Sequence, residues 1–62
     1  MTLVQYIQIE KISAAEKMLM YTDASIEKIA LHFSFSSQSN FGTIFKKITG
    51  MSPANYRKYN HQ

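Results

Sequence analysis

The 62-residue sequence predicts an all-α fold in which one longer helix is followed by three short ones. Apolar residues recur at intervals of three and four along most of the chain, and no stretch alternates with the period of two that is typical of a strand. Serine, proline or glycine interrupts that pattern where helices are expected to begin or end. The composition is 45% hydrophobic with no cysteine, so a single small domain has to be stabilised by its hydrophobic core.

The first predicted helix covers residues 4–20. Its apolar positions share one helical face and are Tyr6, Ile9, Ile12, Ala15 and Leu19. Thr22 and Asp23 then interrupt the pattern as a turn. We expect the C-terminal part of this helix to pack on the rest of the chain, mainly on Phe33, Phe41 and Phe45.

Residues 25–48 are expected to form two short helices joined by a tight turn. Ser25 is a plausible N-cap of the first, and either Ser36 or Ser37 can cap the second, which covers about 37–48. Gly50 supplies the left-handed conformation that is common just past a helix end. The apolar residues are Ile26, Ile29, Ala30 and Phe33 in the first of these helices and Phe41, Ile44, Phe45 and Ile48 in the second.

A last helix is predicted over residues 52–60, with Ser52 as N-cap and Pro53 in the first turn. Tyr56 is expected to pack this helix onto the core with its hydroxyl at the edge. Two short helices joined by a tight turn and flanked by supporting helices form a helix-turn-helix. The sequence therefore predicts one unit over residues 1–62, a small helix-turn-helix (homeodomain-like) bundle of three short helices preceded by a longer helix.

Charge is distributed unevenly along the chain. Residues 1–27 contain two lysines and four acidic residues, a net charge of −2, whereas residues 28–62 contain five basic residues and no acid, a net charge of +5. A basic half without acids suits a polyanionic partner, because each lysine or arginine near a phosphate releases condensed counterions. A merely solvated basic face remains the alternative interpretation of charge alone.

The helix at about 37–48 presents short and amide-bearing side chains opposite its apolar positions. The candidate base-contacting residues are Gln38, Ser39, Asn40, Gly42 and Thr43, and the candidate contacts to the DNA backbone are Ser37, Lys46 and Lys47. Amide side chains form bidentate hydrogen bonds with adenine. Threonine or serine can either donate or accept a hydrogen bond, or can contact a thymine methyl group. Glycine leaves room for a close approach of another molecule. An ordinary polar face of an amphipathic helix is the alternative.

A set of spaced motifs in this part of the chain is similar to the C-terminal signature of AraC-type (AraC/XylS) transcription regulators. The motifs are Ile26-x-x-Ile29-Ala30, Phe35-Ser36-Ser37-Gln38-Ser39-x-Phe41, Phe45-Lys46-Lys47, Gly50-Met51-Ser52-Pro53 and Tyr56-Arg57-Lys58. Tyr6, Lys11-Ile12, Ala15 and Leu19 fall where that family has its joining helix. The resemblance covers about residues 2–58.

The resemblance implies a bacterial, cytoplasmic transcription factor that binds double-stranded DNA. Such domains carry two helix-turn-helix units joined by a long helix, so this chain would hold the joining helix and the second unit. The first unit and the effector domain would be absent from it. By position, Gln38, Ser39, Asn40, Gly42 and Thr43 take the family's base-facing places.

Four positions depart from the family pattern. Ser34 stands where glycine is usual in the tight turn, and if that position needs a positive φ, serine costs about 1 kcal/mol relative to glycine. Thr43 stands where a basic residue is frequent, Leu3 where proline is usual and Lys11 where arginine is usual. One strong guanine or phosphate contact is therefore expected to be missing.

Other function classes receive little support from the sequence. No serine has the paired base and acid that nucleophilic catalysis needs, so we expect no enzyme. His32 and His61 have no spacing that suggests a metal site, and we expect no cofactor and no membrane span. The alternative from another class is a truncated regulator fragment that acts as a protein-interaction or dimerisation module, self-associating through residues 4–12 without specific DNA binding.

Overall fold

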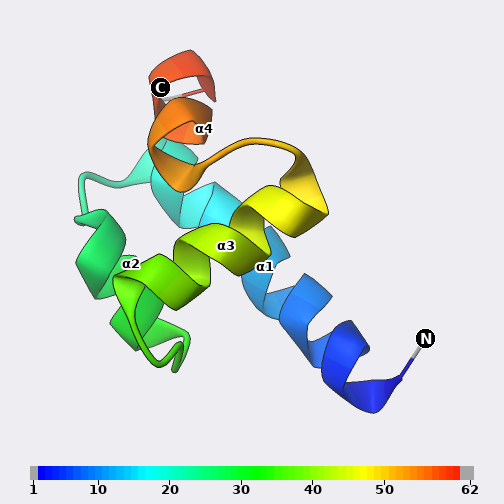
Figure 1. Ribbon diagram of the computed structural model, residues 1–62. Helices are drawn as coiled ribbons and strands as arrows, with labels where there is room; N and C mark the ends of the chain where they lie inside the picture. The colour runs from blue at the N-terminus through cyan, green and yellow to red at the C-terminus, as the bar shows by residue number, and fades with distance from the viewer. Residues whose placement is uncertain (1, 61–62) are drawn as a thin grey trace.

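The computed structural model describes residues 2–60 and contains four α-helices, with no strand in that range. They are α1 (Leu3–Tyr21), α2 (Ile26–His32), α3 (Gln38–Thr49) and α4 (Pro53–Asn60) (Figure 1). The predicted all-α fold, a longer helix followed by three short ones, is confirmed. His61, one of the two histidines considered as metal ligands, lies outside the described residues. No helix among residues 2–60 is long and apolar enough to cross a membrane.

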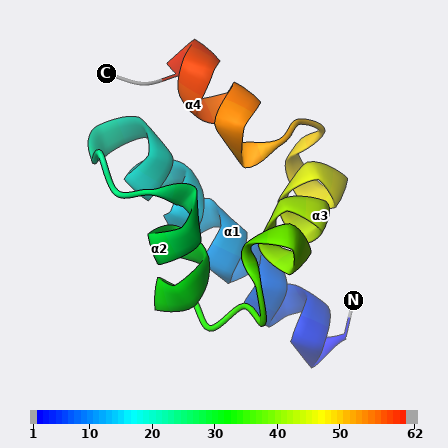
Figure 2. The same cartoon turned by 60° about the vertical axis from the view of Figure 1, so that its left-hand side comes forward.

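The helices pack around the C-terminal half of α1. Figure 2 shows α2 and α3 joined by a short turn, with α4 beyond them near the end of α1. Helix α1 contacts each of the other three helices. Its N-terminal turns project beyond them, as both ribbon views show (Figures 1 and 2).

Short-range caps define most of the helix ends. Ser25 Oγ accepts from the Lys28 N–H at 3.1 Å, which makes it the N-cap of α2 as predicted. Of the two serines that were candidates for α3, Ser37 is the cap, and its Oγ accepts from the Asn40 N–H at 3.0 Å. Gly50 follows α3 with φ 90° and donates its N–H to Lys46 O at 2.8 Å.

The tight turn between α2 and α3 has left-handed backbone at a serine. Ser34 has φ 64° and is the one non-glycine residue with positive φ in the described part of the chain. Its N–H donates to Leu31 O at 3.0 Å, and the Phe35 N–H donates to Ala30 O at 2.9 Å. These two bonds form a Schellman motif, which usually places glycine at the left-handed position. The turn therefore does require the positive φ on which the cost of serine depends.

The core is one cluster of buried side chains contributed by α1, α2, α3 and the turn. Its members are Ile12, Ala15, Leu19, Ile29, Ala30, Phe35, Phe41 and Phe45. The part of the predicted α1 face at Ile12, Ala15 and Leu19 is fully buried. Phe33, which was expected in the core, is only half-buried against the cluster, while Phe35, for which the periodicity predicts no burial, is buried.

Three apolar positions on the periodic faces of α1 and α3 are exposed. Tyr6 is 54% exposed in the N-terminal half of α1, and Ile9 is 39% exposed where it lines an open groove between α1 and α3. Ile48 is near the C-terminal end of α3, where it is 39% exposed. Helical spacing identifies a common face, but burial also requires a neighbouring element along the whole length of the helix.

A row of aromatic rings connects the turn, α3 and α4. Ring centroids are 5.0 Å apart for Phe35 and Phe41, 5.6 Å for Phe41 and Phe45, and 5.4 Å for Phe45 and Tyr56. Tyr56 thus packs α4 onto the core, as expected. Its hydroxyl lies 3.9 Å from the Met20 sulfur. Burial raises the pKa of Tyr56, and the nearby carboxyl group of Glu16 raises it further.

Arg57 fastens α4 to the end of α1. Its Nε donates to Leu19 O at 3.2 Å and its Nη2 donates to Thr22 O at 3.1 Å. The carbonyl groups at a helix C-terminus lack hydrogen-bond donors within the helix, so the guanidinium supplies the missing donors at the end of α1. No local pattern in the sequence predicts this contact, because its partners are 38 and 35 residues apart.

Candidate nucleic-acid interface

Helix α3 is held by its inner face and leaves its outer face open. Phe41 and Phe45 on the inner face are fully buried, and α3 contacts α1, α2 and α4. Because α3 packs against three other helices, its outer side chains stand on a backbone that is held in place by the core. This is the arrangement that a helix needs in order to present side chains to a groove.

The eight candidate residues lie together over the outer part of α3 and its cap. Seven of them are exposed: Ser37, Gln38, Ser39, Asn40, Thr43, Lys46 and Lys47. Gly42 is half-buried. The five candidate base-contacting residues fall within the first half of the helix, and the two lysines lie in its last turn.

Two of these side chains already make hydrogen bonds inside the protein. Ser37 Oγ caps α3 through the Asn40 N–H, and Thr43 Oγ1 donates to Ser39 O at 3.1 Å. Within the described residues, the amide group of Gln38 has no protein hydrogen-bond partner and is exposed. An exposed amide without a protein partner keeps both its donor and its acceptor for another molecule.

Gly42 occupies a place that the fold does not require to be glycine. A Cβ built there would have no heavy atom within 4 Å, and the φ of Gly42 is not positive. Glycine inside a helix costs about 0.5–1 kcal/mol relative to alanine. Since neither backbone conformation nor packing within the chain accounts for that cost, Gly42 fits a surface that another molecule approaches closely.

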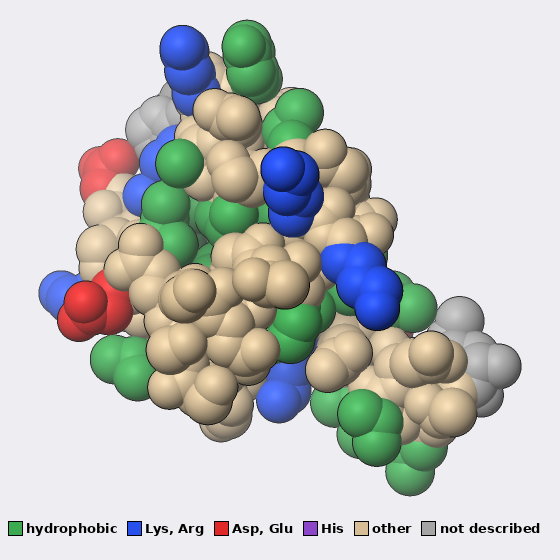
Figure 3. Space-filling model, in the orientation of Figure 1, with side chains coloured by type: hydrophobic (Ala, Val, Ile, Leu, Met, Phe, Trp, Pro, Cys, Tyr) green, Lys and Arg blue, Asp and Glu red, His purple; other side chains and the backbone are tan. Residues whose placement is uncertain are grey.

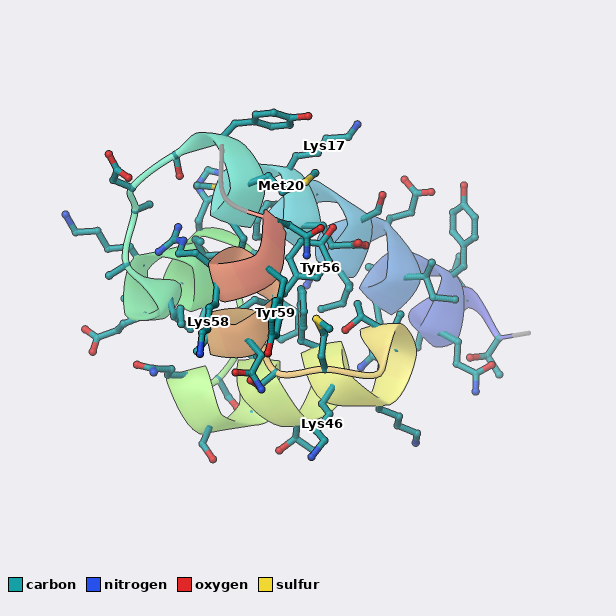
Figure 4. The ribbon with its side chains drawn as sticks, turned by 90° about the horizontal axis from the view of Figure 1, so that it is seen from above. Lys17, Met20, Lys46, Tyr56, Lys58 and Tyr59 are labelled. Atoms are coloured by element: carbon teal, nitrogen blue, oxygen red, sulfur yellow. The ribbon has the colours of Figure 1, made fainter. Side chains whose placement is uncertain are left out.

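The electrostatic setting of α3 favours an anion. The helix has no acidic residue in its first turn and has Lys46 and Lys47 in its last turn. Figure 3 shows a largely polar surface over α3, with Lys and Arg side chains at its right and the visible acidic side chains at the left edge of the molecule. Figure 4 shows Lys17 at the opposite edge of the view from Lys46, with Tyr56 between them.

A second, apolar surface lies at the N-terminal end of α1. Leu3 is 74% exposed and Val4 is 65% exposed, and Tyr6 and Ile7 are exposed beside them. Next to it is a groove of about 460 Å³ between α1 and the C-terminal part of α3. The groove is lined by Gln5, Gln8, Ile9, Ile44, Lys47 and Ile48.

Comparisons with known proteins agree on one family. A sequence model described as a helix-turn-helix domain matches residues 1–59. The melibiose operon regulatory protein of Escherichia coli (strain K12) is 44% identical over 62 residues, which are 100% of this chain and 20% of that protein. The uncharacterized HTH-type transcriptional regulator YbfP of Bacillus subtilis (strain 168) is 39% identical over 59 residues, 95% of this chain and 20% of that protein.

Another relative and a solved structure extend the comparison. The bifunctional transcriptional activator/DNA repair enzyme AdaA of Bacillus subtilis (strain 168) is 42% identical over 57 residues, 92% of this chain and 27% of that protein. The structure of the xylose-binding transcription activator XylR superposes with a TM-score of 0.90 at 31% identity, covering 100% of this chain and 16% of that one. The chain thus spans between a fifth and about a quarter of the length of these curated relatives.

Proposed function

Because the chain belongs to the AraC/XylS-type family of helix-turn-helix regulators, we propose that it is a sequence-specific DNA-binding module of a bacterial transcription regulator. It reads the major groove with α3, which corresponds to the helix that the sequence predicts over about residues 37–48. The proposed role is cytoplasmic, where bacterial DNA is found, and it is not enzymatic. The repair activity in the name of AdaA belongs to that protein, of which this chain covers 27%.

The observation that carries this proposal is the outer face of α3. It combines exposed amide and hydroxyl groups, an uncovered glycine and two lysines, and the helix itself contains no acid. In a helix-turn-helix, the N-terminal residues of the second helix contact base edges. The amides of Gln38 and Asn40 suit adenine, and Ser39 and Thr43 suit several bases.

Phosphate contacts are assigned to the ends of the same helix. Lys46 and Lys47 lie on the C-terminal side of the proposed base contacts and suit the phosphates on the flank of the groove. Ser37 stands at the N-terminus of α3, where the helix dipole favours negative charge. These contacts position the helix and carry no sequence information by themselves.

The test compares two variants of α3 on a panel of duplexes by fluorescence anisotropy at several salt concentrations. We expect wild-type binding with a dissociation constant of roughly 10⁻⁴–10⁻⁶ M for random duplex at physiological salt. Gln38→Ala should weaken the preferred duplex by about 1–3 kcal/mol and relax the preference at one or two base pairs. Lys46→Ala should weaken all duplexes alike and lower the salt slope by about one.

Lys17→Ala is the matched control, since Lys17 is exposed on α1 at the opposite edge of the molecule from Lys46. It removes the same charge and should leave the salt slope nearly unchanged. Binding that does not depend on salt would contradict the proposal, and so would identical effects of all three substitutions across the panel.

A second candidate function is self-association through residues 4–12, in place of specific DNA binding. It is favoured by the exposed apolar end of α1, where Val4, Tyr6 and Ile7 have no covering element. No charged residue occurs among residues 2–9, so two copies of this end can meet without charge repulsion. Burying an apolar side chain of this size contributes about 1.5–3 kcal/mol. The occupant in this case is a second copy of the chain.

A further inference from the structure

The hydroxyl donor of Thr43 is used inside α3, which leaves the methyl group as the part of this exposed side chain without an internal hydrogen bond. Its Oγ1 donates to Ser39 O at 3.1 Å, one turn back along the helix. A hydroxyl has a single hydrogen, so that donor is used inside the helix. The methyl and the hydroxyl share one Cβ and occupy different staggered positions, so fixing the hydroxyl on the carbonyl also fixes the methyl.

The neighbourhood of that methyl is open. Thr43 is exposed, and a Cβ added to the adjacent Gly42 would have no heavy atom within 4 Å. No side chain from elsewhere in the protein therefore covers the Gly42 position next to Thr43. Thr43 therefore contributes a fixed apolar group to α3. The other candidate base-contacting residues have polar side chains, except Gly42, which has no side chain.

The major groove contains one apolar feature of matching size, the C5-methyl group of thymine. We propose that Thr43 is a specificity-determining residue that selects thymine through contact between the two methyl groups. The inference rests on the proposed function, in which α3 enters the major groove. The competing assignment is that Thr43 Oγ1 accepts a hydrogen bond from the amino group of adenine or cytosine, for which its lone pairs remain available.

The experiment begins with selection of duplexes from a random pool by the 62-residue chain at low salt. Each thymine of the preferred duplex is then replaced in turn by deoxyuridine, which lacks only the methyl group. Affinities are measured for the wild type, for Thr43→Val, which keeps the methyl and removes the hydroxyl, and for Thr43→Ser, which does the reverse. Thr43 is exposed, so both variants are expected to fold, and far-UV circular dichroism checks this.

We expect one thymine position at which deoxyuridine weakens wild-type binding about three- to fivefold, the effect of losing one buried methyl. Thr43→Val should bind like the wild type and keep that penalty. Thr43→Ser should bind the thymine duplex about three- to fivefold more weakly and show no further penalty at that position.

A preferred duplex that is insensitive to every deoxyuridine replacement would overturn the methyl contact while leaving the proposed function intact. A loss of binding in Thr43→Val as large as in Thr43→Ser would overturn it in favour of the hydroxyl acceptor. If the pool yields no preferred duplex at all, both the methyl contact and sequence-specific reading by α3 are wrong.

Discussion

Replacing Ser34 by glycine should stabilise the protein. Ser34 has φ 64° in the Schellman turn that ends α2, a conformation in which the Cβ of an L residue crowds the following carbonyl oxygen. The side chain of Ser34 is exposed and makes no hydrogen bond in the described part of the chain, so glycine loses no contact there. Both backbone bonds of the turn, from the N–H groups of Ser34 and Phe35, remain available to the variant.

Two opposing effects set the magnitude. Removing the Cβ relieves about 1–2 kcal/mol of left-handed strain. Glycine also gives the unfolded chain more freedom, which costs about 0.4–1 kcal/mol. The net expectation is a gain of about 0.5–1 kcal/mol in the free energy of unfolding. In a domain of 60–100 residues this raises the melting temperature by about 2–8 °C.

The assay is thermal and urea unfolding followed by far-UV circular dichroism, with two controls. Ser36→Gly lies two residues along, where φ is not positive, and should lower stability through the unfolded chain alone. Gly50→Ala places a Cβ at φ 90° and should lower stability by about 1 kcal/mol. If Ser34→Gly is neutral or destabilising while Gly50→Ala destabilises as expected, the strain assigned to Ser34 does not exist.

Three further expectations concern other parts of the molecule. Gly42→Ala should raise the free energy of unfolding by about 0.5–1 kcal/mol. It should nevertheless weaken duplex binding, because in the proposed complex the new Cβ would stand between α3 and the DNA; unchanged affinity in anisotropy would contradict this. Ile7→Lys should shift self-association toward monomer in analytical ultracentrifugation, with little loss of helical content. A wild-type protein that stays monomeric at millimolar concentration would rule out association through residues 4–12. The raised pKa of Tyr56 means that the folded state holds that proton more tightly, so stability is full below pH about 10 and falls as the pH rises beyond it. Tyr56→Phe should reduce this fall, and equal slopes in urea unfolding across that pH range would refute the linkage.

The sequence predicted the local features of the chain well because their causes lie within a few residues. Ser25 and Ser37 cap helices through N–H groups three residues away, and Gly50 ends α3 by its own backbone freedom. The motifs that indicate the family are also short segments at fixed spacings. The family model matches residues 1–59, which confirms that resemblance. The roles of Gln38 and its neighbours in DNA reading stay predictions.

Local sequence patterns do not predict contacts between residues that are far apart in the chain. The hydrogen bonds from Arg57 to Leu19 and Thr22 join α4 to the end of α1. Because their partners are 38 and 35 residues apart, no local pattern predicts them. The burial of Phe35 depends on how the turn is directed toward the core, where its ring centroid lies 5.0 Å from that of Phe41 at an interplanar angle of 48°.

By itself, then, the sequence determined where the helices begin and end, which residues occupy the outer face of α3, and that Ser34 would be strained if its turn were left-handed. Only the tertiary structure decided which parts of the apolar faces are covered. Ile12 is buried and Ile9 is exposed on the same helix, because Ile12 packs in the core cluster whereas Ile9 borders an open groove between α1 and α3. Periodicity is a property of one helix, whereas burial is a property of two surfaces in contact.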